Sequence, residues 1–215
     1  IAARALQFHE GVKTVQKRGQ YMQETVPEGE GGMVALLGLK REAVEELCQK
    51  AAQGEVVTPA HFNCPGQLVI SGHTNALKRA MTLASEMGAR RTVTLPVSAP
   101  FHCALMVPAG EKLQEYLDGI LINQLAYPVV TNVEAKENQA TDRVKELLVR
   151  QVSHPVLWED SVHTMLTNGV DTFIEIGPGK VLSGLVRKIE RSVKIFNVED
   201  SKSLMELEKS WKELP

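Results

Sequence analysis

The sequence has 215 residues, enough for one large domain or for a domain carrying a smaller insert. Hydrophobic residues make up 43% and charged residues 23%, with a net charge of −2, so nothing indicates a general nucleic-acid binder. No apolar run reaches the length of a membrane-spanning helix, so neither nucleic acid nor a membrane is an expected partner.

The three cysteines, Cys48, Cys64 and Cys103, have neither paired nor metal-ligating spacing, which suits a reducing compartment such as the cytoplasm. The sequence also lacks CxxC, HExxH and EF-hand patterns. We therefore expect no metal.

The first predicted helix covers residues 9–24. At about 100° per residue, one apolar face combines Val12, Val15, Gly19 and Met22, and Arg18 lies at its border. The side chain of Arg18 could pack its stem on the core and keep its charged end in water. Alternatively, it could turn inward to meet an anion, because a guanidinium matches a carboxylate at two points.

A Gly-rich linker at 28–32 leads into six elements with a clear rhythm. Their order, β-α-β-β-α-β, is typical of ferredoxin-like folds and predicts a four-stranded antiparallel sheet with two helices on one face. The predicted elements are the strands Met33–Leu37, Val56–Asn63, Gln67–Ser71 and Arg90–Leu95, and the helices Arg41–Ala52 and Thr74–Met87.

Between the two middle strands, Pro65-Gly66 predicts a tight turn. Asn63 and Gln67 flank this turn, and by themselves they read as ordinary turn residues.

His102 follows the last of these strands after a Ser98-Ala99-Pro100 turn. Pro100 disfavours helical geometry at Ala99, so the chain must change direction before the histidine. A histidine at the exit of a strand lies where α/β proteins keep their ligand crevices. A core or capping histidine is the alternative interpretation.

After His102, helices alternate with strands, a pattern typical of a parallel sheet covered on both faces. Residues 177–180 resemble a phosphate loop only weakly, because the spacing differs and Pro178 lacks an N–H, so we interpret them as a strand-to-helix turn. The predicted elements are helices at 109–117, 141–152, 158–168 and 181–189, strands at 127–131, 171–176 (of buried type) and 193–198, a polar loop at 132–140, and a terminal helix opened by a capping box at 203–206.

A set of short motifs occurs in an order that resembles the malonyl-CoA:acyl-carrier-protein transacylases of type II fatty-acid synthesis. Each motif alone is weak, the ordered set is specific, and together they cover nearly the whole chain. The motifs are Lys17-Arg18-Gly19 with Met22, Asn63-Cys64-Pro65-Gly66-Gln67, Ser98-Ala99-Pro100-Phe101-His102, Arg150-Gln151, Pro155-Val156-Leu157-Trp158 and Glu175-Ile176-Gly177-Pro178-Gly179-Lys180-Val181-Leu182.

The resemblance implies an incomplete α/β-hydrolase-like parallel-sheet core, formed by residues 1–23 and 93–215, with a ferredoxin-like subdomain inserted at 24–92. It also implies a monomeric enzyme that moves malonyl from coenzyme A to the phosphopantetheine thiol of acyl carrier protein through an acyl-serine. Thioester exchange of this kind requires no metal or redox cofactor.

Site roles follow from the same resemblance. His102 is expected to be the general base, and the backbone carbonyl of Gln151 to hold its second ring nitrogen. Arg18 is expected to bind the malonyl carboxylate, and Asn63 and Gln67 to border the cleft.

The nucleophilic serine of the family lies in a Gly-His-Ser-Leu-Gly elbow, and these 215 residues contain no GxSxG. The sequence starts at Ile1, within a helix-like stretch, without a signal-peptide pattern, so we treat it as a fragment that by itself is inactive. Two alternatives stay open: a serine hydrolase or thioesterase of related fold, and an inactive piece that only binds carrier protein.

Overall fold

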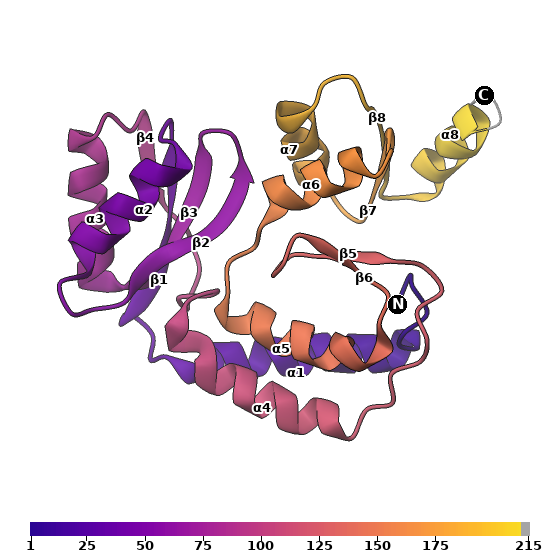
Figure 1. Cartoon of the computed structure of the whole chain (residues 1–215), viewed down its shortest axis with the longest axis horizontal. Coiled ribbons are helices and arrows are strands. Elements are labelled where there is room, and N and C mark those ends of the chain that lie inside the picture. The colour runs from indigo at the N-terminus through magenta and orange to yellow at the C-terminus, as the bar shows by residue number, and fades with distance from the viewer. Residues whose placement is uncertain (212–215) are drawn as a thin grey trace. The chain divides into compact units, whose positions relative to one another are not determined.

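The computed structural model describes residues 1–211 and has a mixed α/β architecture (Figure 1). The described residues divide into two compact units, 1–161 and 162–211. In the first half of the chain, the elements are α1 (Phe8–Thr25), β1 (Gly31–Leu37), α2 (Arg41–Ala52), β2 (Val57–Cys64), β3 (Gln67–His73), α3 (Thr74–Glu86), β4 (Arg91–Thr94), the 3₁₀ turn η1 (Ala104–Met106) and α4 (Val107–Asp118). The later elements are β5 (Val129–Thr131), β6 (Lys136–Asn138), the 3₁₀ turn η2 (Thr141–Arg143), α5 (Val144–Ser153), α6 (Trp158–Thr167), β7 (Thr172–Ile176), α7 (Val181–Ile189), β8 (Lys194–Val198) and α8 (Ser201–Trp211).

The first unit contains a four-stranded sheet in the order β2-β3-β1-β4. All three strand pairs are antiparallel, and Val34 of β1 faces Ile70 of β3 on one side and Thr94 of β4 on the other. The sequence prediction of a four-stranded antiparallel sheet is therefore confirmed. Two of its strands, β2 and β3, are joined by the predicted Pro65-Gly66 turn, where Gly66 has φ +72°.

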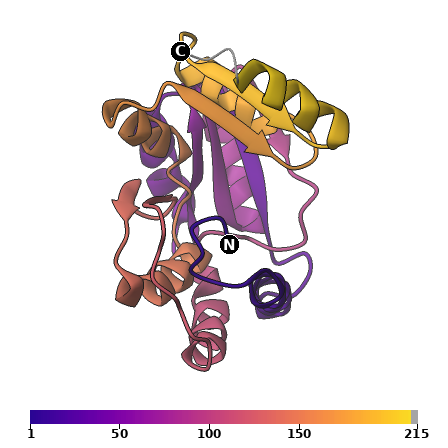
Figure 2. The same ribbon diagram turned by 90° about the vertical axis from the view of Figure 1, so that its right-hand side faces the viewer.

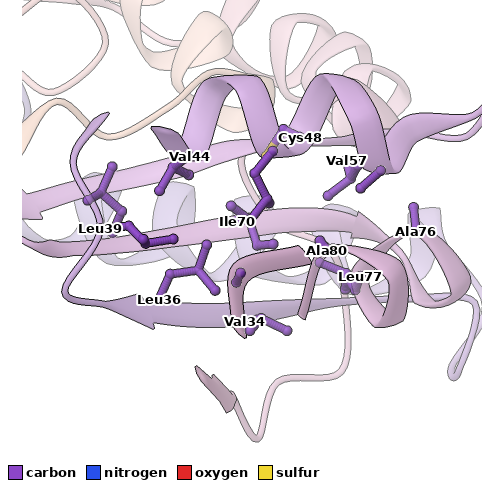
Figure 3. Packing of buried hydrophobic residues seen from close by; sticks show 14 of the residues in the cluster. Val34, Leu36, Leu39, Val44, Cys48, Val57, Ile70, Ala76, Leu77 and Ala80 are labelled. Carbon is purple, nitrogen blue, oxygen red and sulfur yellow. The ribbon is translucent and has the colours of Figure 1, made fainter. Parts of the chain in front are cut away.

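One face of this sheet is covered by α2 and α3 (Figure 1), and a hydrophobic core fills the space between (Figure 3). Alternate residues Val34 and Leu36 of β1 point into this core, where they are almost fully buried. The helices contribute residues spaced three and four apart, as an inward helical face requires. They are Val44, Leu47, Cys48 and Ala51 of α2, and Ala76, Leu77, Ala80 and Ala84 of α3.

Strand β2 is irregular, and this changes which way its side chains point. Its pairing with β3 shifts between Pro59 and His61. Val57 and Phe62 both lie in the same core although an odd spacing puts residues of a regular strand on opposite faces. The shift is a β-bulge, and it leaves His61 opposite Val69, on the face away from α2 and α3.

The second face of the sheet carries a smaller core of Met33, Ala60 and Val69. The segment that follows β4 crosses this face, since Val97 and Phe101 pack against the same three residues. This packing brings the chain to His102 directly beside the sheet.

Helices α1, α4 and α5 form a separate layer of the first unit (Figure 1). Its core combines Met22 of α1, Met106 of η1, Leu113 of α4 and Val152 of α5 with Ala99 from the loop before His102. The turn that carries the histidine is therefore held from two sides, by the sheet and by the helix layer.

The predicted inward face of the first helix is wrong in part. Val12 and Val15 are 49% and 67% exposed, whereas Gly11, Thr14 and Met22 are buried. Spacings of three and four residues from Gly11 and Thr14 place Arg18 on the buried side rather than at the border of an apolar face.

Two further predictions differ from the structure. Residues 132–140, predicted as a loop, contain β6, which forms an antiparallel hairpin with β5. The helix predicted at 141–152 is divided into η2 and α5.

The second unit contains two parallel strands, β7 and β8, which lie side by side (Figure 2). The prediction of a buried strand at 171–176 is wrong, because Ile174 is 38% and Ile176 81% exposed. Within residues 1–211, the other parallel pairing is the single bridge between His61 and Val156, so only the coarse α/β class is established here.

The loop from Gly177 to Lys180 is a strand-to-helix turn, as predicted. Carboxylates accept its N–H groups: Glu199 accepts from Gly179, and Glu175 accepts from Leu182 and Ser183 at the start of α7. With these amides satisfied by the protein's own carboxylates, the loop does not form a phosphate cradle.

The last helix begins earlier than its predicted capping box. The carboxylate of Asp200 accepts the backbone N–H of Ser203, so Asp200 caps α8, which starts at Ser201. Across residues 1–211, no helix is long and apolar enough to cross a membrane.

Candidate active site

His102 lies in a turn that is closed by two local hydrogen bonds. The N–H of Phe101 donates to the carbonyl of Ala99 at 3.1 Å, and the thiol of Cys103 donates to the carbonyl of Pro100 at 3.1 Å. His102 itself has φ +61°, in the left-handed region that is unfavourable for most residues other than glycine. Such strain persists only where the surrounding packing enforces it, and here buried Ala99, Pro100 and Cys103 do so.

The ring of His102 is oriented by α5. Its Nδ1 lies 2.9 Å from the backbone carbonyl of Gln151. A carbonyl oxygen can only accept, so Nδ1 carries the proton and Nε2 keeps its lone pair. This is the tautomer that a general base requires, and the carbonyl lies at the ring nitrogen that the aspartate contacts in a Ser-His-Asp triad.

The side chain of Gln151 is held in place by two hydrogen bonds. Its Nε2 donates to the carbonyls of His154 and Pro155 at 3.0 and 3.2 Å. These bonds tie the end of α5 to the segment that follows, and so hold the carbonyl that orients His102.

Arg18 lies close enough for its charge to act on His102. Burial lowers the pKa of Arg18 below its usual value, although the side chain stays protonated at neutral pH. Across residues 1–211, no ion pair or hydrogen bond joins Arg18 to a carboxylate. A partly buried cation without an internal counter-ion is suited to an anionic ligand.

The pKa of His102 is lowered from its ordinary value of 6.5. Burial is the largest cause, and the charge of Arg18 acts in the same direction, while backbone hydrogen bonds to Gln151 and His154 oppose them. The imidazole is therefore neutral, and able to accept a proton, at physiological pH.

His61 is a site residue that the sequence analysis missed. Its ring lies 5.1 Å from that of His102, centroid to centroid, at an interplanar angle of 58°. No local signal in the sequence marks His61, because its position depends on the bulge in β2 and on a loop 40 residues further along the chain.

Asn63 and Gln67 lie on the β2–β3 hairpin, as predicted. Asn63 stands at a second irregularity of β2, and the side-chain oxygen of Gln67 accepts from the thiol of Cys64 at 3.8 Å. The structure brings Arg18, Gln151 and His102 together, and it gives the predicted cleft role of Asn63 and Gln67 no direct support.

An open groove of about 510 Å³ reaches His102 from one side. Its lining is largely apolar, with Phe62, Val107 and Pro155, and it carries the polar side chains of Glu45 and His154. This groove exposes His102 to molecules in solution. A second cavity, of about 410 Å³, is lined by the N-terminal residues, β5 and α5 and reaches Gln151 but not His102.

Within residues 1–211, no group of three or more His, Cys, Asp or Glu side chains is placed to hold a metal ion. The chemistry that these residues offer is proton transfer at His102 and anion binding at Arg18.

Comparison with known proteins assigns the family. The acyl transferase domain family matches residues 1–212. The chain belongs to the acyl transferase domain family. Among relatives with this domain, the malonyl CoA-acyl carrier protein transacylase of Bacillus subtilis (strain 168) is 47% identical over 205 residues, which cover 95% of this chain and 65% of the relative.

Solved structures of acyl transferases agree with this fold. The malonyl CoA-acyl carrier protein transacylase from Clostridium perfringens superposes with a TM-score of 0.94 at 48% identity, over 98% of this chain and 66% of that one. A type II PKS acyl-carrier protein in complex with its malonyl-transacylase gives a TM-score of 0.94 at 40% identity, over 97% and 67%. The chain thus spans just under two thirds of the length of the first two of these acyl transferases.

Proposed function

We propose that the protein transfers malonyl from coenzyme A to the phosphopantetheine thiol of acyl carrier protein, through an acyl-serine intermediate. The observation that carries this proposal is the bond between Nδ1 of His102 and the carbonyl of Gln151, with Arg18 nearby. This geometry supplies a neutral base, His102, near a cation, Arg18, that forms no ion pair within residues 1–211. The relatives named above carry the name of malonyl transacylases.

In the first half-reaction, the serine hydroxyl attacks the thioester carbonyl of malonyl-CoA, and Nε2 of His102 takes the hydroxyl proton. The tetrahedral intermediate then expels the thiolate of coenzyme A, which receives this proton from His102. An ester bond to serine has formed and the thioester bond has broken.

The second half-reaction runs the same steps in reverse on another thiol. The phosphopantetheine thiol gives its proton to His102 and attacks the serine ester. The serine oxygen leaves and takes the proton back, so His102 returns to its neutral state. Nothing is oxidised or reduced in these steps, so they need no redox cofactor.

Arg18 binds the malonyl carboxylate in this proposal. Two parallel N–H···O bonds from the guanidinium match the two carboxylate oxygens. Asn63 and Gln67 border the cleft that admits the acyl group. These assignments rest on the motif match and on the absence of a competing carboxylate at Arg18 within residues 1–211.

We further propose the finer architecture that the resemblance implies. Residues 1–23 and 93–215 belong to an α/β-hydrolase-like core, and residues 24–92 form the inserted ferredoxin-like subdomain. The protein acts as a monomer in the cytoplasm. The four-stranded antiparallel sheet and its two covering helices support the insert.

The test is malonyl transfer from malonyl-CoA to holo-acyl carrier protein, measured in a protein that includes the serine elbow. His102→Ala is expected to lower kcat/KM by about 10²- to 10⁴-fold, the usual contribution of a general base. His9→Ala, which removes an exposed imidazole from α1, is the control and is expected to leave the rate unchanged. Hydrolysis of malonyl-CoA that outruns transfer to carrier protein would instead support a thioesterase.

A further inference from the structure

A β-bulge in β2 places the side chain of His61 beside His102. The bulge in β2 turns His61 to the face opposite α2 and α3, where it pairs across the strands with Val69. The loop after β4 packs on this same face through Val97 and Phe101, next to His102. Two segments that are distant in sequence therefore bring two imidazoles to a centroid distance of 5.1 Å.

The tilted arrangement is one that aromatic rings favour. Edge-to-face and offset pairs have centroids 4.5–7 Å apart, because the positive edge of one ring meets the negative face of the other. The interplanar angle of 58° fits this class. His102 is thus bounded by the carbonyl of Gln151 at Nδ1 and by the ring of His61 at another side.

We propose that His61 is a positioning residue for His102: its uncharged ring restricts rotation of the catalytic imidazole and keeps water from one of its sides. This inference rests on the proposed role of His102 as general base. His61 itself exchanges no proton with the substrate.

Burial, more than the charges around the pair, keeps His61 neutral. Burial is the main cause that lowers the pKa of His61 to about 4, and repulsion from His102 is the second. Above this pKa, His61 is the neutral imidazole. In this state it packs on its neighbour as an uncharged aromatic ring.

Other groups also face His102 and enter its titration. Arg18 approaches from α1 and disfavours a second cation, Cys103 follows in the chain, and Glu45 of α2 and His154 line the same groove. Among residues 1–211, the ring that packs against the imidazole of His102 is that of His61.

Removal of the ring is expected to have two linked effects. In His61→Ala, water enters beside His102, so the desolvation that lowers the pKa of His102 is weakened and this pKa rises toward 6.5. The freed imidazole also samples unproductive orientations, so kcat falls by roughly tenfold. His61→Phe restores a planar ring of similar size that cannot titrate, and is expected to recover the wild-type pKa and most of the lost rate.

The experiment combines two measurements on wild type, His61→Ala, His61→Phe and the exposed-site control His9→Ala. The first is NMR titration of the His102 ring nitrogens, which reports the pKa without any need for turnover. The second is the pH profile of kcat/KM for malonyl transfer in a protein that includes the serine elbow. In His61→Ala, both the NMR pKa and the acid limb of the profile are expected to move upward together, and His9→Ala to move neither.

The outcomes separate this inference from the proposed function. If His102→Ala abolishes transfer while His61→Ala leaves the His102 pKa and kcat unchanged, His61 has no positioning role and the proposed function stands. If His102→Ala retains full activity, the proposed function fails, and the NMR titration still decides whether His61 desolvates His102. If His61→Phe shifts the pKa as far as His61→Ala does, ring packing is overturned as the cause.

Discussion

At the scale of single residues, Arg18 is unusual because its charge is half-buried without an ion pair to a carboxylate within residues 1–211. Arg18→Ala is expected to lower the ratio of kcat/KM for malonyl-CoA to that for acetyl-CoA by roughly 10- to 100-fold, because under the proposed function the charge-assisted bidentate bond is lost only for malonyl. Arg18→Lys keeps the charge but not the planar fork, so it is expected to weaken malonyl transfer less than Arg18→Ala does.

The control for Arg18 is Lys13→Ala, an exposed cation on the same helix that should leave the ratio unchanged. The decisive quantity is the ratio of the two specificity constants, because a structural defect lowers both alike. An unchanged ratio in Arg18→Ala, with both constants reduced, would show that the carboxylate is bound elsewhere.

At the scale of elements, the start of β1 determines where the His102 turn can lie. A Cβ added to Gly31 would stand 2.5 Å from Cγ of Pro100, a rigid ring atom that cannot move without the turn. Gly31→Ala is therefore expected to displace His102 and to lower kcat by about 10- to 100-fold, the effect of a misplacement near 1 Å.

The neighbouring glycine provides a matched control for Gly31. A Cβ at Gly32 would meet only Cδ1 of Leu77, at an ordinary 3.7 Å. Gly32→Ala is expected to keep kcat within about twofold of wild type, because nothing that supports the turn has to move. Equal losses in the two variants would contradict a specific role for the contact with Pro100.

A second element-scale prediction concerns Glu175, which anchors the start of α7. Its carboxylate accepts from the N–H groups of Leu182 and Ser183 and from the side chain of Asn197. Burial raises the pKa of Glu175, but these hydrogen bonds outweigh it and lower the pKa overall. Glu175→Gln removes the charge from the helix N-terminus and is expected to lower the free energy of unfolding by about 1–2 kcal/mol.

The measurement for Glu175 is urea unfolding at pH 7, with Glu206→Gln as control. Glu206 is exposed and pairs with Lys202 only at 4.0 Å, so its charge contributes little. If both variants had the same free energy of unfolding, the network around Glu175 would not anchor α7.

At the scale of the whole molecule, the half-buried histidines His61 and His102 determine how stability responds to mild acid. The pKa of His61 is about 4 in the folded chain and 6.5 in the unfolded chain, so the unfolded chain binds more protons between these values. Stability is therefore full above pH 6.5 and is lost as pH falls toward 4, by at most about 3 kcal/mol from His61. His102, whose pKa is also lowered, acts in the same direction.

Urea unfolding at pH 7.5 and pH 5 tests this dependence. His61→Phe is expected to reduce the difference between the two pH values, because the variant has no proton to gain at this position. A free energy of unfolding that is equal at both values in the wild type would contradict it. Hydrogen bonds from Arg143 and Arg150 lower the pKa of Glu134, so this carboxylate stays charged at both pH values and does not contribute to the difference between them.

The elements whose signals are local could be predicted from the amino-acid sequence. The apolar spacing of α2 and α3, the strands of the four-stranded sheet and the Pro65-Gly66 turn all follow from residues close together in the chain. The apolar spacing, the strands and the turn are decided by backbone geometry and by short-range periodicity. The family and the pairing of His102 with Gln151 were instead implied by the resemblance that the ordered motifs carry.

Which surfaces are covered and which side chains meet depends on packing between elements that are distant in the sequence. Val12 and Gly11 lie on different faces of α1, and the sequence could not rank these faces. Ile1 packs on Gly11, and the core with α4 takes in Met22, so the face with Gly11 and Met22 is the buried one. His61 was invisible because a single bulge reverses the direction of its side chain. Contacts of this kind depend on partners distant in sequence, so their free energy is absent from any local pattern.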